Sequence, residues 1–364
     1  MRRDHLERLR PICPTCRAVG RQALPLTLGT IVRAEAEDVI EGVLLCPNPD
    51  CQREHPIIDG IAVVVPDLQS WASHQLDAVL RRDDLSSFME SLLGDAAGPG
   101  SVLDRERTTL SAYARTHWGD LDPNEPIQRE ASFVQLLDSA LELMPQPPRG
   151  VWVDLGCSVG RGTLEMARRT GDLAVGVDLS FSMLRMAERA RRKGRAVFGL
   201  RRVGLVFDRC DLAIADVPTE RLSFWCCDVG ALPFADATFD GALSLNVVDC
   251  VPSPLGHLME LGRVLRGGAP ALLSSPYDWS PNSTPVAQWL GGHSQRSPRH
   301  GSSAAELRRA LASIDNGLVI KRECDRAPWR VYVNERASMD YAVHLLYTER
   351  SATAGGSGDV VDCL

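Results

Sequence analysis

The chain has 364 residues, of which 44% are hydrophobic and 24% are charged, and its formal net charge is −7. This length accommodates about two globular domains, and the acidic balance argues against a protein that coats nucleic acid. The longest apolar stretches, such as residues 61–65, are too short to span a bilayer, and the N-terminus lacks the apolar core of a secretory signal. We therefore expect a cytoplasmic protein with no membrane segment.

Two pairs of cysteines stand close to the N-terminus. "PICPTC" contains Cys13 and Cys16, and "LLCPNPDC" contains Cys46 and Cys51. Two such turns offer four thiolates for tetrahedral zinc, and a small segment with few large apolar residues usually needs a metal or disulfides. The pattern predicts a structural zinc held by these four cysteines, with a hairpin over residues 29–46. The alternative is four unconnected free cysteines.

The segment after the second pair resembles a known family. Residues 53–67, "REHPIIDGIAVVVPD", are similar to the end of Trm112-like zinc ribbons, where a "YPI.DGIP" pattern follows the last cysteine pair. His55 stands where that pattern has Tyr. The resemblance implies a Trm112-like zinc ribbon over residues 1–67. Eight arginines and ten acidic residues in this segment argue against a clamp for RNA.

Residues 68–148 are expected to form a helical linker and lid region. Apolar residues recur at helical spacing in residues 70–82, 86–95 and 131–144, and "GDAAGPGS" has the composition of a linker. The amphipathic stretch "LSAYARTHWGD" carries Tyr113 and Trp118. We expect these two rings to close a pocket from above.

A glycine-rich turn follows a buried strand in "GVWVDLGCSVGRGTLEMARRTG". The glycines allow a sharp turn and a close approach to a ligand, and the helix behind them offers free N–H groups. The next strand, "LAVGVDLS", ends in Asp178, where nucleotide-binding α/β folds place an acid that binds ribose hydroxyls. The pattern indicates a nucleotide-type ligand.

Three more strands alternate with helices downstream, which predicts a parallel, doubly wound sheet with helices on both faces. They end near Asp228, near Asn246 and at residue 275. Ligands of such sheets bind at the carboxyl ends of the strands. We therefore expect Asp178, Asp228 and Asn246 to share one site; the alternative is that they are ordinary loop residues.

Four motifs in order, "VDLGCSVGRGT", "GVDLS", "CCDVGALPFADATFD" and "ELGRVLRGG", resemble those of class I S-adenosylmethionine-dependent methyltransferases. The resemblance implies a Rossmann-like methyltransferase domain over residues 149–350, followed by a flexible tail over residues 351–364. It implies S-adenosylmethionine as cofactor, with its methionine end on the glycine loop, its ribose on Asp178 and its adenine beside Asp228. Ser158 stands where the family has a second glycine. The residues assigned to the cofactor are Asp154, Gly156, Cys157, Ser158, Gly160, Asp178, Leu179, Met183, Asp228, Val229 and Asn246.

Residues 196–222 exceed the usual length between the second and third strands and are expected to form a hairpin. A similar insertion, the "GC-small-VGR" loop and the elements "SPYDW", "TP" and "WLGG" after the fifth strand resemble the C-terminal methyltransferase domain of ovothiol synthases. The resemblance implies methylation of an imidazole nitrogen of a histidine or thiohistidine-like acceptor. This chain has a ribbon in place of the sulfoxide-synthase domains, so that thiolation would need another protein.

Residues 274–292 combine stiff prolines with aromatic rings, as an acceptor pocket requires. We expect Tyr277, Asp278 and Asp249 to act in catalysis. The residues expected to bind the substrate are Tyr113, Trp118, Tyr277, Asp278, Trp279 and Trp289, and His293 and His344 are further candidates. The alternative is that Trp279 and Trp289 only pack the segment onto the sheet.

Three functions remain open from the sequence. The first is methyl transfer to a small polar metabolite, which needs alignment of the acceptor more than acid–base chemistry. The second is methylation of a base in ribosomal or transfer RNA, since zinc ribbons also precede such domains, although the acidic charge argues against nucleic acid. The third is a methyltransferase fold that only binds and does not catalyse. The sequence identifies no protein partner.

Overall fold

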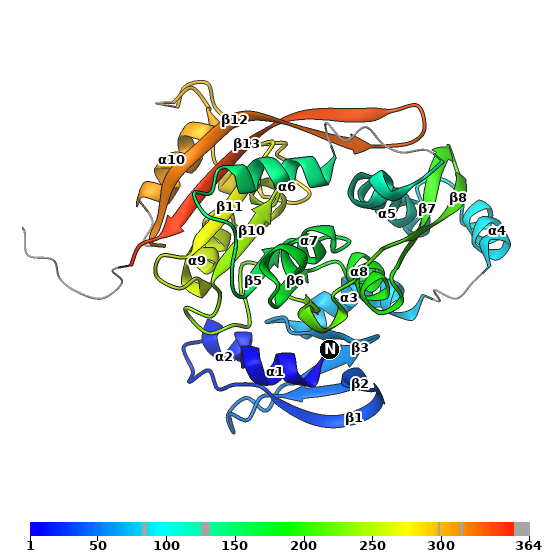
Figure 1. Cartoon of the computed structure of the whole chain (residues 1–364), viewed down its shortest axis with the longest axis horizontal. Helices are drawn as coiled ribbons and strands as arrows, with labels where there is room; N and C mark the ends of the chain where they lie inside the picture. Colours follow the sequence, from blue (N-terminus) through cyan, green and yellow to red (C-terminus); the bar gives the residue numbers. More distant parts are fainter. Residues whose placement is uncertain (82–85, 125–131, 298, 314–315, 353–364) are drawn as a thin grey trace, which may run out of the picture.

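A mixed sheet of eleven strands runs through the molecule in the computed structural model, which describes residues 1–81, 86–124, 132–297, 299–313 and 316–352 (Figure 1). The strand order is β1-β2-β3-β4-β9-β6-β5-β10-β11-β13-β12. The doubly wound α/β architecture predicted from the alternating strands and helices is confirmed.

Seven of the eleven strands form the half of the sheet that carries the predicted site. β9, β6, β5, β10 and β11 are parallel, and β13 returns antiparallel to β11 and pairs with β12. The strands are β5 (Trp152–Leu155), β6 (Ala174–Asp178), β9 (Leu222–Cys226), β10 (Gly241–Leu245), β11 (Pro270–Ser275), β12 (Leu318–Tyr332) and β13 (Ser338–Arg350). The parallel strands are buried along their length, as expected when both faces of a sheet are covered.

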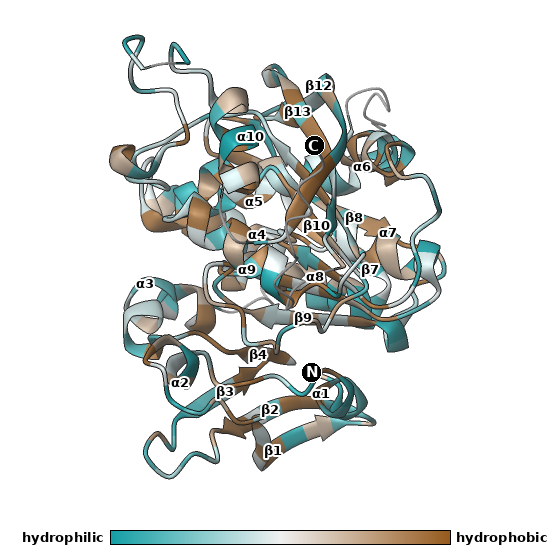
Figure 2. Ribbon diagram, turned by 90° about the vertical axis from the view of Figure 1, so that its left-hand side faces the viewer, coloured by the Kyte–Doolittle hydropathy of each residue, from teal (hydrophilic) through white to brown (hydrophobic). Residues whose placement is uncertain are grey.

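Helices cover both faces of this sheet. One apolar cluster joins α5, α6 and α7 to one face, and a second joins α9 and α10 to the other. Figure 2 shows hydrophobic residues along the inner strands, between these layers. The bounds are α3 (Leu68–Leu80), α4 (Ser87–Ala97), α5 (Val102–Trp118), α6 (Phe133–Glu142), α7 (Arg161–Thr170), α8 (Phe181–Lys193), α9 (Pro254–Val264) and α10 (Ser303–Ser313), with short 3-10 helices η1 (Gly119–Leu121), η3 (Thr219–Arg221), η4 (Val248–Cys250) and η5 (Val286–Gln288).

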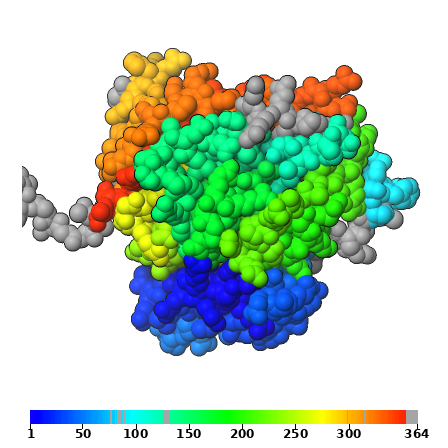
Figure 3. Space-filling model, in the orientation of Figure 1, coloured from blue at the N-terminus to red at the C-terminus, as the bar shows by residue number. Residues whose placement is uncertain are grey.

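The N-terminal segment continues the same sheet. Its elements are α1 (Arg3–Leu9), α2 (Pro14–Ala18), β1 (Thr27–Glu35), β2 (Asp38–Leu45), β3 (Glu54–Ile58) and β4 (Ile61–Val63). β4 pairs parallel to β9, with Ala62 opposite Trp225, and Arg17 of α2 donates two hydrogen bonds to Glu260 of α9. The predicted hairpin between the cysteine pairs is confirmed as β1 and β2. Figure 3 shows the segment covering the base of the molecule.

The predicted insertion forms a two-stranded hairpin apart from the main sheet. β7 (Arg195–Val203) and β8 (Val206–Ala213) pair antiparallel, which confirms the expectation for residues 196–222. The hairpin packs on α5, where the Arg201 backbone N–H donates to Ser111 Oγ at 2.7 Å. Of the expected tail, residues 353–364 lie outside the described part of the chain. No helix among the described residues is long and apolar enough to cross a membrane.

Candidate active site

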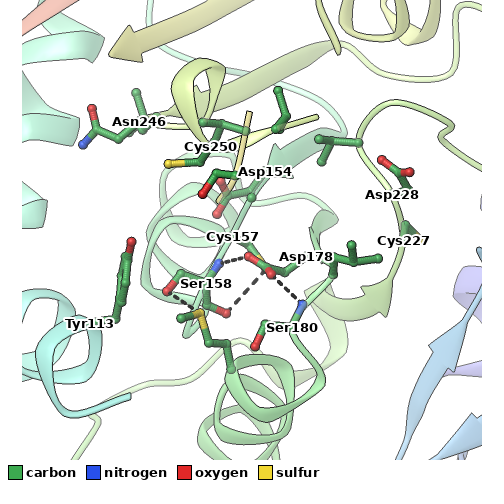
Figure 4. Close-up of a pocket in the computed structure, with 18 of the residues that line it drawn as sticks. Tyr113, Asp154, Cys157, Ser158, Asp178, Ser180, Cys227, Asp228, Asn246 and Cys250 are labelled. Atoms are coloured by element: carbon green, nitrogen blue, oxygen red, sulfur yellow. Dashed lines mark hydrogen bonds between the residues drawn. The ribbon is translucent and has the colours of Figure 1, made fainter. Parts of the chain in front are cut away.

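A cavity of about 440 Å³ opens at the carboxyl ends of β5, β6, β9 and β10 (Figure 4). Tyr113 stands on one side of it and Asp228 on the opposite side. The cavity is lined by Tyr113, His117, Phe133, Asp154, Gly156, Cys157, Ser158, Asp178, Leu179, Ser180, Met183, Cys227, Asp228, Val229, Leu245, Asn246, Val247, Cys250, Val251, Pro252, Ser283 and Trp329. Ten of the eleven residues expected at the cofactor are in this set, and Gly160 is not.

The glycine-rich turn after β5 has no room for larger side chains. A Cβ on Gly156 would lie 2.6 Å from Val247 Cγ2, and one on Gly160 would lie 2.7 Å from Ala187 Cβ. Both glycines have positive φ angles, which residues with a side chain rarely adopt. Ser158 also has a positive φ, of 52°. The turn therefore holds the backbone close to the cavity, with Gly160 behind it at the start of α7.

Asp178, at the end of β6, is held by the backbone on both of its oxygens. Oδ2 accepts the N–H of Ser158 at 2.9 Å, and Oδ1 accepts the N–H of Ser180 at 2.8 Å (Figure 4). Burial raises the pKa of this carboxyl group, and the two N–H donors act in the opposite direction. A carboxylate has about four lone-pair positions, so Asp178 keeps capacity for hydroxyl groups of a ligand.

Asp154 is the most buried carboxyl group of the cavity wall, with 5% of its surface exposed. Thr163 Oγ1 donates to its Oδ2 at 2.8 Å. Burial raises the pKa of Asp154 to about 7, and the nearby Asp178 charge acts in the same direction. A positive group of a ligand would stabilise the ionised form.

The ends of β9 and β10 place Asp228 and Asn246 at the rim. Asp228 Oδ1 accepts the N–H of Gly230 at 2.8 Å. Asn246 has a positive φ of 58°, and its Oδ1 accepts the hydroxyl of Ser274 at 2.8 Å. Asp228 and Asn246 thus share the cavity with Asp178, as expected from the strand ends.

Of the six residues expected to bind the acceptor, the structure places only Tyr113 in the cavity wall. Trp118 is almost fully buried below the wall, where its indole N–H donates to the Val159 carbonyl and Arg161 lies over its ring. Trp279 and Trp289 stack on each other with ring centroids 6.0 Å apart. This stacking is the arrangement expected if both rings pack the segment onto the sheet.

The three residues expected in catalysis lie behind the wall of the cavity. Asp249 is buried, and its two oxygens accept the Ser275 hydroxyl and the Asp278 backbone N–H, both at 2.8 Å. Asp278 accepts the hydroxyl of Tyr341 at 3.0 Å. The chain turns at Tyr277, whose φ is 58°. Asp249 holds this turn, and Tyr277, Asp278 and Asp249 are not among the residues that line the cavity, so their expected placement in the wall is corrected; Ser283 of the same segment does line it.

The two histidine candidates also lie outside the wall. His344 Nδ1 is 2.6 Å from the Tyr277 hydroxyl, and its Nε2 is 3.2 Å from Glu323. His293 contacts the Gly291 carbonyl through Nδ1.

Sequence reasoning missed most of the aromatic wall. His117 and Phe133 stack with ring centroids 4.0 Å apart and planes 15° apart, and Trp329 of β12 completes the wall. Tyr113 and His117 are four residues apart on α5, so the helical spacing was a signal that they share a face. Trp329 had no such signal, because only the return of β12 over the sheet brings it to this cavity.

The four N-terminal thiols gather as the cysteine pairs predict. Cys13, Cys16, Cys46 and Cys51 place their sulfur atoms within 4.8 Å of one another, with Cys16 and Cys46 3.7 Å apart. Thiolates at about 2.3 Å from a tetrahedral zinc ion are separated by similar distances. The His55 ring is 3.9 Å from Cys13 Sγ, where the ribbon family has Tyr. The donor set fits zinc.

Comparisons with known proteins agree with this site. The family described as "Methyltransferase domain" matches residues 153–273. Norajmaline N-methyltransferase of Rauvolfia serpentina is 22% identical over 232 residues, which are 62% of this chain and 67% of that protein. Methyltransferase GfsG of Streptomyces halstedii is 28% identical over 117 residues, 32% of this chain and 34% of that protein, so that the chain spans about a third of its length.

Among solved structures, similarity extends to geranyl diphosphate C-methyltransferase from Streptomyces coelicolor A3(2). That structure has a TM-score of 0.40 and 16% identity, over 60% of this chain and 76% of that one. A complex of the Haloferax volcanii Trm112 methyltransferase activator and a methyltransferase is also similar. Its TM-score is 0.42 at 19% identity, over 69% of this chain and 99% of that one.

The matched methyltransferase region begins in β5 and ends in β11. It therefore contains the strands and turns that build the carboxylate side of the cavity, including Asp178 and Asp228. Sequence similarity and site geometry thus coincide on the same residues. Residues 153–273 therefore form a methyltransferase domain, and the matched family and relatives support an enzyme that transfers a methyl group from S-adenosylmethionine.

Proposed function

We propose that this enzyme transfers the methyl group to a ring nitrogen of a small planar acceptor, an imidazole of the histidine or thiohistidine type. One observation carries the proposal: a single cavity joins a side rich in carboxylates to a side made of aromatic rings. The resemblance of the segment after β11 to ovothiol-type methyltransferases favours an imidazole. The curated relative named an N-methyltransferase favours nitrogen as the accepting atom.

The carboxylate side fits S-adenosylmethionine, which supplies a methyl group on a positively charged sulfur when bound. Asp154, buried with no cation among its hydrogen-bond partners, suits a positive group of the cofactor. Asp178 would hold the ribose hydroxyls, Asp228 and Val229 the adenine edge, and Asn246 the rim. The tight turn at Gly156 would let the backbone approach the methionine end.

The aromatic side supports an acceptor that needs no prior deprotonation. Burial, together with Arg161, lowers the pKa of His117 to about 3. This ring is therefore a weak base and is poorly suited to remove a proton from the acceptor. The described residues that line the cavity include no arginine or lysine, which favours a neutral or cationic acceptor over an anionic one. A ring nitrogen with a free lone pair fits both conditions, because it attacks while neutral. The chain's own residues then mainly orient this nitrogen and exclude water.

We further propose that residues 1–67 are a Trm112-like ribbon with a structural zinc, that residues 68–148 are a linker and lid, and that the methyltransferase domain covers residues 149–350. Four buried or half-buried thiols within ligand distance support the zinc. Reduced thiols of this kind persist in reducing compartments, which supports a cytoplasmic location.

The decisive experiment identifies the labelled product. Purified protein is incubated with methyl-labelled S-adenosylmethionine and a fractionated metabolite extract, with total RNA in a parallel reaction. We expect label in a small molecule and on an imidazole nitrogen. Label in RNA, on carbon or on oxygen would contradict the proposal. Asp178→Ala serves as the control variant with impaired cofactor binding.

A further inference from the structure

Two buried polar groups in the aromatic wall have no hydrogen-bond partner among the residues that the structure describes. They are Nδ1 of His117 and the indole Nε1 of Trp329. Both residues line the cavity, and 5% and 7% of their surfaces are exposed. A buried donor or acceptor without a partner is costly, and in a residue that lines a cavity it favours a ligand that supplies the missing partner. Both atoms are themselves covered in this structure, so a ligand reaches them after a small movement of the two rings.

Trp329 stands apart from the other tryptophans of the chain. Its ring packs on Tyr341 at a centroid distance of 5.2 Å, yet its N–H remains unpaired. The indole N–H is a donor only, so its partner must be an acceptor atom. The other six tryptophans donate to oxygen atoms of the protein; they are Trp71, Trp118, Trp152, Trp225, Trp279 and Trp289.

His117 lines the same cavity, and its contacts fix the position of the ring. Stacking on Phe133 sets the plane of the ring, and the His117 carbonyl accepts Nη1 of Arg161 at 3.1 Å. The neutral imidazole has one nitrogen that accepts a hydrogen bond. A ligand N–H can therefore bind to it without any transfer of a proton.

Contacts between α5 and β12 hold the two rings in one wall. Thr116, the neighbour of His117, accepts the backbone N–H of Tyr332 on its Oγ1 at 3.4 Å. Behind Trp329, Tyr341 donates to Asp278, so that the segment after β11 supports this wall from outside the cavity. Asp278 thus acts one layer behind the wall, whereas Ser283 of the same segment lines the cavity.

We propose that His117 and Trp329 form the acceptor subsite: His117 accepts the N–H of a neutral nitrogen heterocycle, and Trp329 donates to an oxygen or sulfur atom carried by that ring. This inference rests on the proposed function and specifies which residues recognise the acceptor. With its N–H held by His117, an imidazole has its second nitrogen free to face the methyl group. The exocyclic sulfur or oxygen sets the rotation of the ring in its plane.

Two probes separate the two contacts. Imidazole offers an N–H but no exocyclic atom, whereas imidazole-2-thione adds a sulfur that can accept from Trp329. Binding of each probe is measured by calorimetry on the full chain saturated with S-adenosylhomocysteine. The variants are His117→Phe, which keeps a ring to stack on Phe133, and Trp329→Phe, which keeps a ring but removes the N–H. The control is Trp152→Phe, which loses an N–H bonded to the Arg149 carbonyl outside the cavity.

We expect His117→Phe to lower the affinity for both probes about three- to tenfold, as the loss of one hydrogen bond predicts. Trp329→Phe should weaken the thione by a similar factor and leave imidazole unchanged. Trp152→Phe should leave both affinities unchanged even if the melting temperature falls. Unchanged thione affinity in either cavity variant, or no binding of either probe to the wild type, would overturn the subsite.

The proposed function can fail separately. Probe binding does not depend on which atom receives the methyl group, so a labelled product methylated on carbon would contradict nitrogen transfer and leave the subsite standing. As a second readout, the ¹⁵N chemical shifts of the His117 ring should change on addition of imidazole. If these chemical shifts stay the same in the wild-type protein when imidazole is added, the subsite is contradicted, even where the variants are unstable.

Discussion

The two ends of the cavity are built in different ways. The carboxylate end comes from successive strand–turn units within residues 153–273, and each unit adds one polar group at the end of its strand. The aromatic end combines α5 and α6, which precede these units, with Trp329 of β12, which follows them. The first end is encoded locally, and the second exists only after the chain has closed on itself. This difference suggests that changes near the four N-terminal cysteines and at the strand ends affect cofactor binding first, and that changes at Tyr277, Asp278 and Trp279 act on the acceptor through packing.

Loss of the metal should have the largest effect and should reach the carboxylate end, because β4 pairs with β9, the strand that leads to Asp228. Cys16→Ser leaves three thiolates, and structural zinc contributes about 10 kcal/mol or more in small zinc domains. We expect the zinc content, measured by metal analysis, to fall below the roughly one equivalent per chain expected for the wild type, and the Tm to fall by about 10 °C or more. Exposed Cys324 provides the control, as Cys324→Ser. If the wild-type protein is folded and contains no metal, the predicted zinc site is excluded.

Asp178→Ala should weaken binding of the cofactor strongly and binding of the acceptor little. The variant removes a carboxylate acceptor and leaves the N–H groups of Ser158 and Ser180 without their partner. Hydrogen bonds to charged groups contribute about 1.5–3 kcal/mol, which predicts a tenfold to hundredfold loss of affinity for S-adenosylmethionine by calorimetry. Asp236→Ala, at an exposed carboxylate, is the control. Equal affinity in the variant and the wild type would exclude Asp178 from the cofactor site.

Asp154 should make cofactor binding depend on pH. Its folded pKa of about 7 lies above the ordinary value of 3.8, so the carboxyl group ionises in the unfolded chain before it does so in the folded protein, and the stability of the free protein falls as pH rises toward 7. A cationic cofactor prefers the ionised form, so its affinity should rise about tenfold from pH 6 to pH 8. Calorimetry at the two pH values measures this change. Asp154→Asn should abolish it, and a pH dependence that persists in this variant would assign the effect to another group.

Tyr277→Phe should have the smallest effect. It removes the contact between the Tyr277 hydroxyl and His344, a cost of about 0.5–1.5 kcal/mol in the free energy of unfolding. Turnover on the identified acceptor should stay within about twofold, because a smaller cost to folding leaves the cavity wall in place. Thermal denaturation and steady-state kinetics measure the two quantities. A large loss of turnover at an unchanged Tm would restore the direct role that the sequence suggested for Tyr277.

Ten of the eleven expected cofactor residues line the cavity, because each side chain is tied to a local pattern. Gly156 shows the strength of such a pattern: a strand that turns sharply at a positive φ needs glycine whatever surrounds it. The two cysteine pairs are also local patterns, since the short turn within each pair brings its own two thiols together. For the acceptor, the same reasoning found Tyr113 but not His117 or Trp329, because aromatic residues occur both in cores and in pockets.

By itself, the sequence determined the order of strands and helices, the glycine turn, the strand-end acids and the four thiols, all of which depend on neighbours within a few residues. The tertiary structure decided that the N-terminal strands extend the main sheet and that Trp329 faces the cavity while Trp279 and Trp289 do not. Those outcomes depend on pairings between β4 and β9 and between β12 and β13. The physical reason is that an apolar ring can be buried at many places, and only the packing of distant elements selects one of them.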